Sequence, residues 1–420
     1  MKIIQSFWSK PAFHSIQSYA NARKLGGWLN FKYFLISAAY SCLTLRKHHK
    51  KVYLYTDTQG SGLMGDLLDL PFEDISLSLN TLDNEDHRLW IRGKMHAIEQ
   101  QTGPFIHVDN DIYIWEPLPV KPDIILQSRI PMWAEYKLSL NEIFANFKYI
   151  PECLKERPTE KTTVANVGII GGHDMDLFQR FCEESRKLLE HNREFLPLVG
   201  LGGFNQMMEE YLFTSMVRHE KKDAYYLLEN LKTDFRITNV EFNLVPLVFK
   251  YIHLIGNNKQ SPYACEQLEL RLKYEFPEYH ARVLEVLNGL GVEDTELRND
   301  EVRRDRLMKS LQIFYRNSLE EIRNMKIRIR PEAEVIRVDD YLTSSRIYVV
   351  REPDNPQMCL LPSQGWEGLT PWLDDTGRKL HKAFTINELI AGNDLQGFNE
   401  TILINSIAFN LTQTGLMEFA

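Results

Sequence analysis

Residues 105–112 read Phe-Ile-His-Val-Asp-Asn-Asp-Ile, an apolar run that leads directly into two carboxylates one residue apart. The apolar part, Phe105–Val108, is predicted to be a buried strand. Side chains two residues apart in extended backbone point the same way, so Asp109 and Asp111 can approach one cation. Hard divalent cations such as Mn²⁺ and Mg²⁺ prefer such oxygen ligands. Two acids in a solvated turn would give the same short pattern, so a metal site needs a second signal.

A second polar segment begins at His253, where the sequence reads His-Leu-Ile-Gly-Asn-Asn-Lys at the end of a predicted strand, Phe249–Ile255. The imidazole of His253 can supply a further metal ligand. Gly256 lets the backbone approach a phosphate closely, and Lys259 offers a positive charge for a diphosphate. Alone, this segment is better explained by a core histidine followed by a surface turn. Together with the Asp pair, it predicts a metal site that holds a diphosphate.

The first 260 or so residues alternate short apolar runs with amphipathic stretches. This alternation favours an α/β domain built on a mostly parallel, Rossmann-like mixed sheet. Open sheets of this kind bind ligands at the carboxyl ends of their strands, where the polar segments lie. The predicted strands are Lys2–Gln5, Lys51–Tyr55, Phe105–Val108, Asp123–Gln127, Thr163–Ile170 and Phe249–Ile255, and the predicted helices are Phe31–Arg46, Arg92–Gln101, Met175–Asn192 and Asn205–Val217.

The sequence changes character after Lys259. Residues 261–330 are predicted to be a helical extension, rich in charge, that ends before Pro331. Within it, Glu301–Arg306 reads as a solvent-exposed charged face. Residues 331–420 combine short strands with two helices, Thr385–Ala391 and Asn399–Thr412, which indicates a small α+β, winged-helix-like domain. The chain is thus predicted to have three parts, residues 1–260, 261–330 and 331–420.

Charge and composition argue against several classes of protein. The formal net charge of −8 disfavours a broad surface for nucleic acid or anionic membrane. The most membrane-like stretch, Tyr33–Leu45, is shorter than the ~20 residues that a span needs, so we expect a buried helix there. The five cysteines are scattered and include no Cys-x-x-Cys pair, so neither a disulfide framework nor a zinc knuckle is expected. A reducing, cytoplasmic location fits this pattern best.

The order of the two metal-binding segments resembles that of a known enzyme group. A strand followed by Asp-x-Asp, and roughly 140 residues later by His-x-x-Gly-x-x-Lys, is similar to the glycogenin and lipopolysaccharide-galactosyltransferase group of GT-A glycosyltransferases. The resemblance covers residues 1–260. It implies that Asp109, Asp111 and His253 bind manganese or magnesium, and that Gly256 and Lys259 contact the diphosphate of a nucleotide sugar.

Other landmarks of the same group follow in order. Asn166-Val167-Gly168 resembles the Asn-x-Gly that faces the transferred sugar. Phe204-Asn205-Gln206 resembles the Asp-Gln start of a helix, although Asn205 replaces the acid, which puts a catalytic carboxylate there in doubt. In the helix that follows, Glu209 or Glu210 could serve as a general base. The resemblance thus implies catalytic roles for Asn205, Gln206 and Glu209, and donor-binding roles for Asp57, Lys94, Asn166, Gly168, Gly256 and Lys259.

The C-terminal part is similar to the PQQ-chaperone-like recognition elements of ribosomal-peptide maturation systems. The resemblance rests on the run Phe384–Ala391, the stretch Leu403–Leu411 and the closing Thr414-Gly415-Leu416. It implies that residues 331–420 dock a leader peptide by adding a strand to their sheet. The alternative is a small domain that stabilises the enzyme or a homodimer.

Taken together, these features predict a metal-dependent glycosyltransferase that moves a sugar from a nucleotide sugar, a UDP-sugar by resemblance, to a saccharide or peptide acceptor. The order of the motifs favours retention of anomeric configuration. Two alternatives use the same residues differently. One is a metal-dependent nucleotidyltransferase or nucleotide-sugar hydrolase, and the other is a non-catalytic, peptide-binding scaffold.

Overall fold

The computed structural model describes residues 1–14, 25–132, 134–159, 161–228, 242–292, 301–331, 334–340, 345–352, 355–360, 382–391 and 400–420. The chain divides into two compact units. The first unit consists of Met1–Lys232 and Arg282–Glu293, and the second consists of Thr233–Ala281 and Asp294–Ala420.

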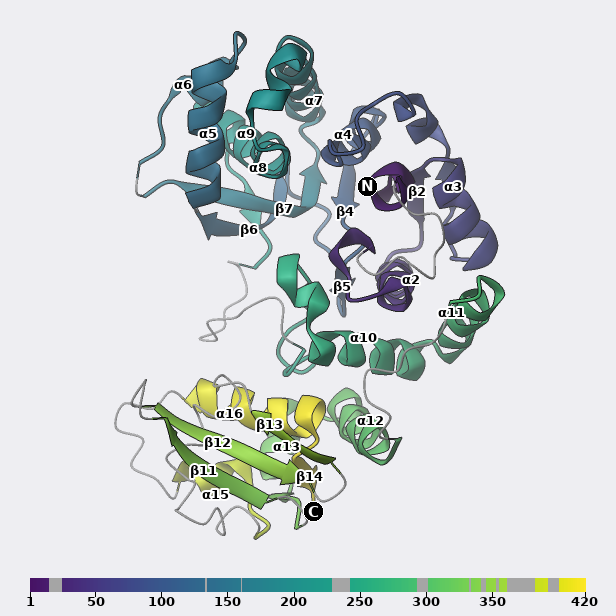
Figure 1. Ribbon diagram of the computed structural model, residues 1–420, viewed down its shortest axis with the longest axis vertical. Coiled ribbons are helices and arrows are strands. Elements are labelled where there is room, and N and C mark those ends of the chain that lie inside the picture. The colour runs from purple at the N-terminus through teal and green to yellow at the C-terminus, as the bar shows by residue number, and fades with distance from the viewer. Residues whose placement is uncertain are drawn as a thin grey trace. The chain divides into compact units, whose positions relative to one another are not determined.

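The first unit is built on a seven-stranded mixed sheet of order β3-β2-β1-β4-β7-β6-β8 (Figure 1). All of its neighbouring strands run parallel except β7, which is antiparallel to both β4 and β6. This architecture confirms the predicted α/β class with a Rossmann-like mixed sheet. The strands are β1 (Lys2–Phe7), β2 (Val52–Thr56), β3 (Asp74–Ser76), β4 (Phe105–Val108), β6 (Ile125–Pro131), β7 (Thr163–Gly172) and β8 (Tyr225–Tyr226).

Strand β4 spans Phe105–Val108, as its apolar run predicted, and all four of its residues are buried. A strand buried on both faces reads as a continuous apolar run rather than as an alternating one. Its antiparallel neighbour β7 approaches very closely at Gly171. A Cβ atom added there would lie 2.1 Å from the carbonyl oxygen of Phe105. Glycine at this position therefore lets β7 lie directly beside the strand that leads to the Asp pair.

Helices pack against this sheet through one large apolar core. Phe105 of β4 lies 5.1 Å from Phe178, ring centroid to centroid, and Phe178 stacks on Phe213 at 5.5 Å. These rings join β4 to α7 (Met175–Glu190) and α9 (Leu212–His219) within the same core cluster. The other helical segments of this unit are α1 (Ser9–Phe13), η2 (Leu25–Gly27), α2 (Phe31–His48), α3 (Thr58–Ser61), η3 (Gly62–Leu67), η4 (Ser78–Leu82), α4 (Ile91–Glu99), α5 (Ala134–Asn146), α6 (Glu152–Lys155), η5 (Arg193–Leu198), α8 (Leu201–Gln206) and η6 (Met207–Tyr211), and the short strand β5 covers Ile112–Ile114.

Two helices bear directly on the sequence predictions. The stretch predicted as a buried helix is α2, which is buried from Phe31 to Leu45. Among the described residues, no helix is long and apolar enough to span a membrane. The helix predicted to begin at Asn205 begins instead at Leu201, because two glycines of low helix propensity disguise its first turn in the sequence. It continues through the π-helical turn η6 into α9.

The second unit combines helices with short antiparallel strands. Strands β11 (Glu334–Asp340), β12 (Ser345–Glu352) and β13 (Asn355–Leu360) form an antiparallel sheet, and β10 (Ile327–Ile329) pairs with β14 (Met417–Phe419). The described residues of the C-terminal part thus contain the predicted short strands. The remaining elements are β9 (Tyr251–His253), η7 (Gly256–Gln260), α10 (Pro262–Glu275), α11 (Pro277–Gly289), which extends across the boundary between the units, α12 (Glu301–Arg316), α13 (Leu319–Asn324), α15 (Ile386–Ala391), α16 (Glu400–Phe409) and η10 (Asn410–Thr414).

The charged run at the start of α12 is not entirely a solvated face, so that prediction is wrong for Arg303. Its guanidinium is buried and makes hydrogen bonds of 2.7 and 2.8 Å to the two carboxylate oxygens of Glu266. It also donates to the carbonyls of Gln413 and Thr414. A fork of five N–H donors can satisfy all of these acceptors at once. Arg303 therefore fastens the end of η10 to α10 inside the second unit.

Candidate functional site

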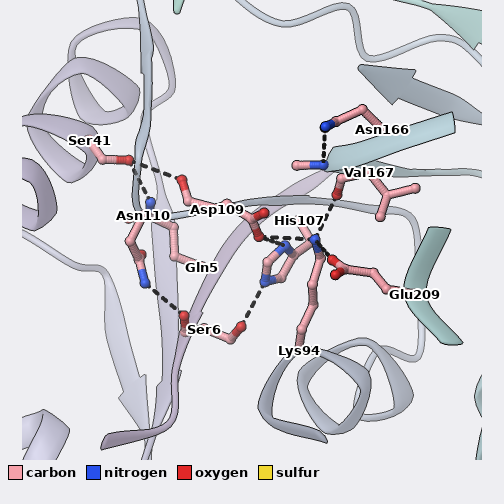
Figure 2. A network of polar contacts seen from close by, with 11 residues as sticks. Gln5, Ser6, Ser41, Lys94, His107, Asp109, Asn110, Asn166, Val167 and Glu209 are labelled. Carbon is pink, nitrogen blue, oxygen red and sulfur yellow. Dashed lines mark hydrogen bonds and ion pairs between the residues drawn. The ribbon is translucent and has the colours of Figure 1, made fainter. Parts of the chain in front are cut away.

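The Asp pair begins where β4 ends, and backbone hydrogen bonds fix the turn. The N–H of Asp109 donates to the carbonyl of Gly168 at 2.9 Å, and the N–H of Ile112 donates to the carbonyl of Asp109 at 3.2 Å. Between the acids, Asn110 donates from Nδ2 to the carbonyl of Ser6 at 2.8 Å (Figure 2). Its own carbonyl accepts from Ser37 Oγ at 2.9 Å. The middle residue of Asp-Asn-Asp thus ties the turn to β1 and α2, a role that sequence analysis missed.

Lys94 of α4 lies beside Asp109 at the centre of the polar network in Figure 2. Its Nζ lies 3.0 Å from Asp109 Oδ1 and donates to the carbonyl of Val167 at 2.6 Å. It also donates to Glu209 Oε1. An ammonium group has three donors, and these three acceptors use all of them. Burial by itself would lower the pKa of Lys94, but the Asp109 and Glu209 carboxylates outweigh it and raise the pKa above its ordinary value.

His107 is a second polar group beside Asp109 that sequence analysis did not single out. Its side chain is buried within β4, and its Nε2 shares a 2.8 Å hydrogen bond with Ser6 Oγ. Its Nδ1 lies 3.6 Å from Asp109 Oδ1. Burial, with a smaller effect from the Lys94 charge, lowers the pKa of His107 well below its usual value. The neutral imidazole therefore packs beneath the carboxylate without adding charge, and its only signal in the sequence was a polar residue inside an apolar strand.

Asp109, Asp111 and His253 form a group that could hold a metal ion. Each offers one ligand atom, and these atoms lie within 4.8 Å of one another. Two carboxylate oxygens and one imidazole nitrogen suit a divalent cation of intermediate hardness such as Mn²⁺, and the oxygens also suit Mg²⁺. The donor set therefore fits the kind of metal that the sequence predicted.

The two donor-binding residues predicted on β7 lie beside Asp109. The carbonyl of Gly168 accepts the Asp109 N–H, and the N–H of Gly168 donates to Asn166 Oδ1 at 3.0 Å. Asn166 is largely buried. Because β7 runs antiparallel to β4, its residues 166–168 lie next to the carboxyl end of β4. Asn166 and Gly168 therefore lie at the edge of the sheet where the sequence predicted ligand binding. Gly168 contacts Asp109 through its backbone carbonyl.

The predicted residues Gly256 and Lys259 lie on η7. Gly256 has a φ of +53°, a left-handed conformation that favours glycine, and an added Cβ would meet no atom within 4 Å. The exposed backbone at Gly256 suits the close approach of a phosphate that the sequence suggested. Lys259 lies three residues further along the same 3₁₀ segment and is partly buried.

The two residues predicted at the start of the catalytic helix, Asn205 and Gln206, have different surroundings. Asn205 is fully buried, accepts from the N–H of Ile91 at 3.3 Å and donates to the carbonyls of Arg88 and Leu201. It thereby holds the start of α4, the helix that carries Lys94. Gln206 is exposed. A catalytic role for either residue stays a prediction.

Asp57 joins the carboxyl ends of β1 and β2. Its Oδ1 accepts from the N–H of Gly60 at 2.8 Å, and its Oδ2 accepts from the N–H and the hydroxyl of Ser9, each at 2.8 Å. This carboxylate therefore caps α3 and fixes the chain that follows β1. Contact with a nucleotide base stays a prediction for Asp57.

One protein family matches the first two thirds of the chain. The model of one family, described as a family of unknown function (DUF6734), matches residues 1–286. The chain belongs to this family. No curated protein matches it. Among solved structures, the chain is similar to mouse xyloside xylosyltransferase 1 in its apo form, at 10% sequence identity and a TM-score of 0.27, over 54% of this chain and 84% of that one.

Proposed function

We propose that this protein is a metal-dependent glycosyltransferase that uses a nucleotide sugar. The observation that carries the proposal is the group formed by Asp109, Asp111 and His253, whose ligand atoms lie within 4.8 Å of one another. The resemblance in the sequence assigns the same three residues to the metal. Two segments that are distant in the sequence, each weak evidence for a metal site by itself, thus supply the ligands of one candidate site.

The reaction explains why such a site would need a cation. Breaking a glycosyl–phosphate bond places negative charge on the departing diphosphate. One opposite unit charge at 4 Å is worth about 4 kcal/mol at an effective dielectric of 20, so a single lysine such as Lys259 is a modest counterweight. A bound divalent ion would supply Lewis-acid stabilisation of the diphosphate oxygens. We propose Mn²⁺ first and Mg²⁺ second, because the donor set includes an imidazole.

The chain's own residues would position the donor. Lys94 fixes the side chain of Asp109 from within the protein and balances its charge together with that of Glu209. We therefore propose that Asp109 is held ready for the metal by Lys94. By resemblance, the donor is a UDP-sugar, with contacts from Asp57, Asn166, Gly168, Gly256 and Lys259. The acceptor is proposed to be a saccharide or a peptide, the latter docked as an added strand on the β11–β12–β13 sheet.

Titration calorimetry with a panel of nucleotide sugars, with and without Mn²⁺, tests this proposal. The wild type should bind a UDP-sugar only when Mn²⁺ is present. Asp109→Ala should lose that binding, because it removes a ligand of the ion. Asp176→Ala, which removes an exposed carboxylate on α7, is the matched control and should bind normally.

Product analysis separates the alternatives. A transferase releases UDP and yields a glycosylated acceptor, whereas a nucleotidyltransferase releases pyrophosphate and a hydrolase yields free sugar even when acceptors are supplied. A wild-type protein that binds no nucleotide sugar in the presence of Mn²⁺ would contradict the proposal and favour the peptide-binding scaffold.

A further inference from the structure

Two neighbouring glutamates on the π-helical turn η6 have quite different surroundings. Glu209 is buried and ion-paired with Lys94, so its carboxylate is already engaged in holding Asp109 in place. Glu210 is only partly buried, and it has no lysine or arginine among its described ion-pair partners. A π-helical turn inserted in a longer helix changes the direction of successive side chains and is frequent at functional sites. The two neighbouring carboxylates therefore have different partners.

Glu210 is held in place from two sides. Tyr136 of α5, a buried residue, donates from its hydroxyl to Glu210 Oε2. Thr214 donates from Oγ1 to the carbonyl of Glu210 at 2.6 Å and accepts from the N–H of Ala165 at 2.9 Å. Ala165 directly precedes the donor-site candidate Asn166 on β7. Among the described contacts, none uses the other carboxylate oxygen, Oε1. One oxygen of Glu210 is thus anchored, and the side chain lies close enough to Lys94 and Asp109 for their charges to act on it.

The charged groups that act on Glu210 belong to the same site. They are Glu209, Lys94 and Asp109, together with the Tyr136 hydroxyl. Burial is the largest effect and the Glu209 charge the next, and they raise the pKa of Glu210 to about 8 against the opposing effects of Tyr136 and Lys94. A general base is most effective when its pKa lies near the working pH.

We propose that Glu210 accepts the proton of the hydroxyl group that attacks the donor sugar, and that Tyr136 is the positioning residue that holds it. This inference rests on the proposed function. The acceptor oxygen forms a bond to the anomeric carbon, while the bond from that carbon to the diphosphate oxygen breaks and its electron pair leaves with UDP. The acceptor proton moves to the carboxylate of Glu210. The acceptor class is therefore an alcohol, either a sugar hydroxyl or a hydroxylated side chain, and water can take its place.

The test compares donor binding with UDP release into water, in the presence of Mn²⁺ and the UDP-sugar that binds best. Glu210→Gln keeps the shape of the side chain but cannot accept the proton. It should bind the donor within about twofold of the wild type, while UDP release falls on the order of 10²-fold, the lower end of what a general base contributes. Tyr136→Phe should move the pH at which UDP release rises to a higher value, because the lost hydrogen bond stabilises the carboxylate.

A second Tyr–Glu pair provides the matched control. Tyr149 donates to Glu184 Oε2 at 2.5 Å. Tyr149→Phe and Glu184→Gln should change neither donor binding nor UDP release. UDP release by Glu210→Gln at the wild-type rate would overturn the inference, as would a wild type that binds a donor but releases no UDP into water. In either case, donor binding by the wild type would still support the proposed function. A wild type that binds no UDP-sugar would overturn the proposed function and the inference about Glu210 together.

Discussion

Replacing Lys94 by methionine tests the central network most directly, because methionine keeps much of the side-chain volume and removes the charge. In the wild type, Lys94 Nζ lies 3.0 Å from Asp109 Oδ1 and also pairs with Glu209. At 3.0 Å a unit-charge pair is worth about 5.5 kcal/mol at an effective dielectric of 20. Loss of one partner from a buried pair typically costs about 3–5 kcal/mol, because the remaining charge stays buried without compensation.

We therefore expect Lys94→Met to lower the free energy of unfolding by about 3–5 kcal/mol. Glu209 is the charge left behind, since Asp109 is 31% exposed and can be hydrated, whereas Glu209 is buried. The double variant Lys94→Met/Glu209→Gln should then recover a large part of the loss, because it removes that charge as well.

Urea unfolding followed by tryptophan fluorescence measures these differences through a double-mutant cycle. Glu209→Gln alone should cost less than Lys94→Met, because Lys94 retains Asp109 and the Val167 carbonyl as partners. A loss below about 1 kcal/mol for Lys94→Met would match an exposed ion pair and would refute the buried network. A double variant that is less stable than Lys94→Met would also refute it.

Three further predictions follow from single contacts. His253→Ala should weaken Mn²⁺ binding at least tenfold in calorimetry, and unchanged Mn²⁺ affinity would remove His253 from the donor set. Because the folded-state pKa of Glu210 is raised to about 8, its contribution to stability should be complete below about pH 4.5 and should decline as the pH rises through 8. Glu210→Gln should abolish this decline. If the unfolding midpoints of the wild type and the variant ran parallel between pH 5 and pH 9, the prediction would be contradicted. Gly171→Ala places a methyl group against the Phe105 carbonyl and should lower the melting temperature. Gly103→Ala, where nothing lies within 4 Å of the added Cβ, should not lower it. Equal melting temperatures for the two variants would show that β4 and β7 can separate.

The sequence by itself determined the elements with continuous apolar patterns. Strand β4 spans the predicted Phe105–Val108, and α2 starts at the predicted Phe31. Both are buried, so local hydrophobicity and tertiary environment agree there. The start at Leu201 was missed because Gly202 and Gly203 have low helix propensity, and packing of the rest of that helix overrides this local preference.

The sequence also indicated the candidate metal ligands, because Asp109, Asp111 and His253 each follow or end an apolar strand. Strand geometry limits where such side chains can point, and the carboxyl ends of strands gather in one region. A short sequence motif at the end of a strand can therefore indicate which residues, distant in the chain, it will lie near in the fold. The ligand atoms of the three residues do lie close together.

Only the tertiary structure decided which residues support these ligands. Lys94, Glu209 and Val167 come from three separate segments, and their contacts depend on how α4, η6 and β7 pack around β4. Likewise, the sequence offers no reason to separate Glu209 from Glu210, yet one pairs with Lys94 and the other with Tyr136. The physical reason is that burial and charge pairing depend on neighbours distant in the chain, whereas strand and helix patterns depend on neighbours close in it.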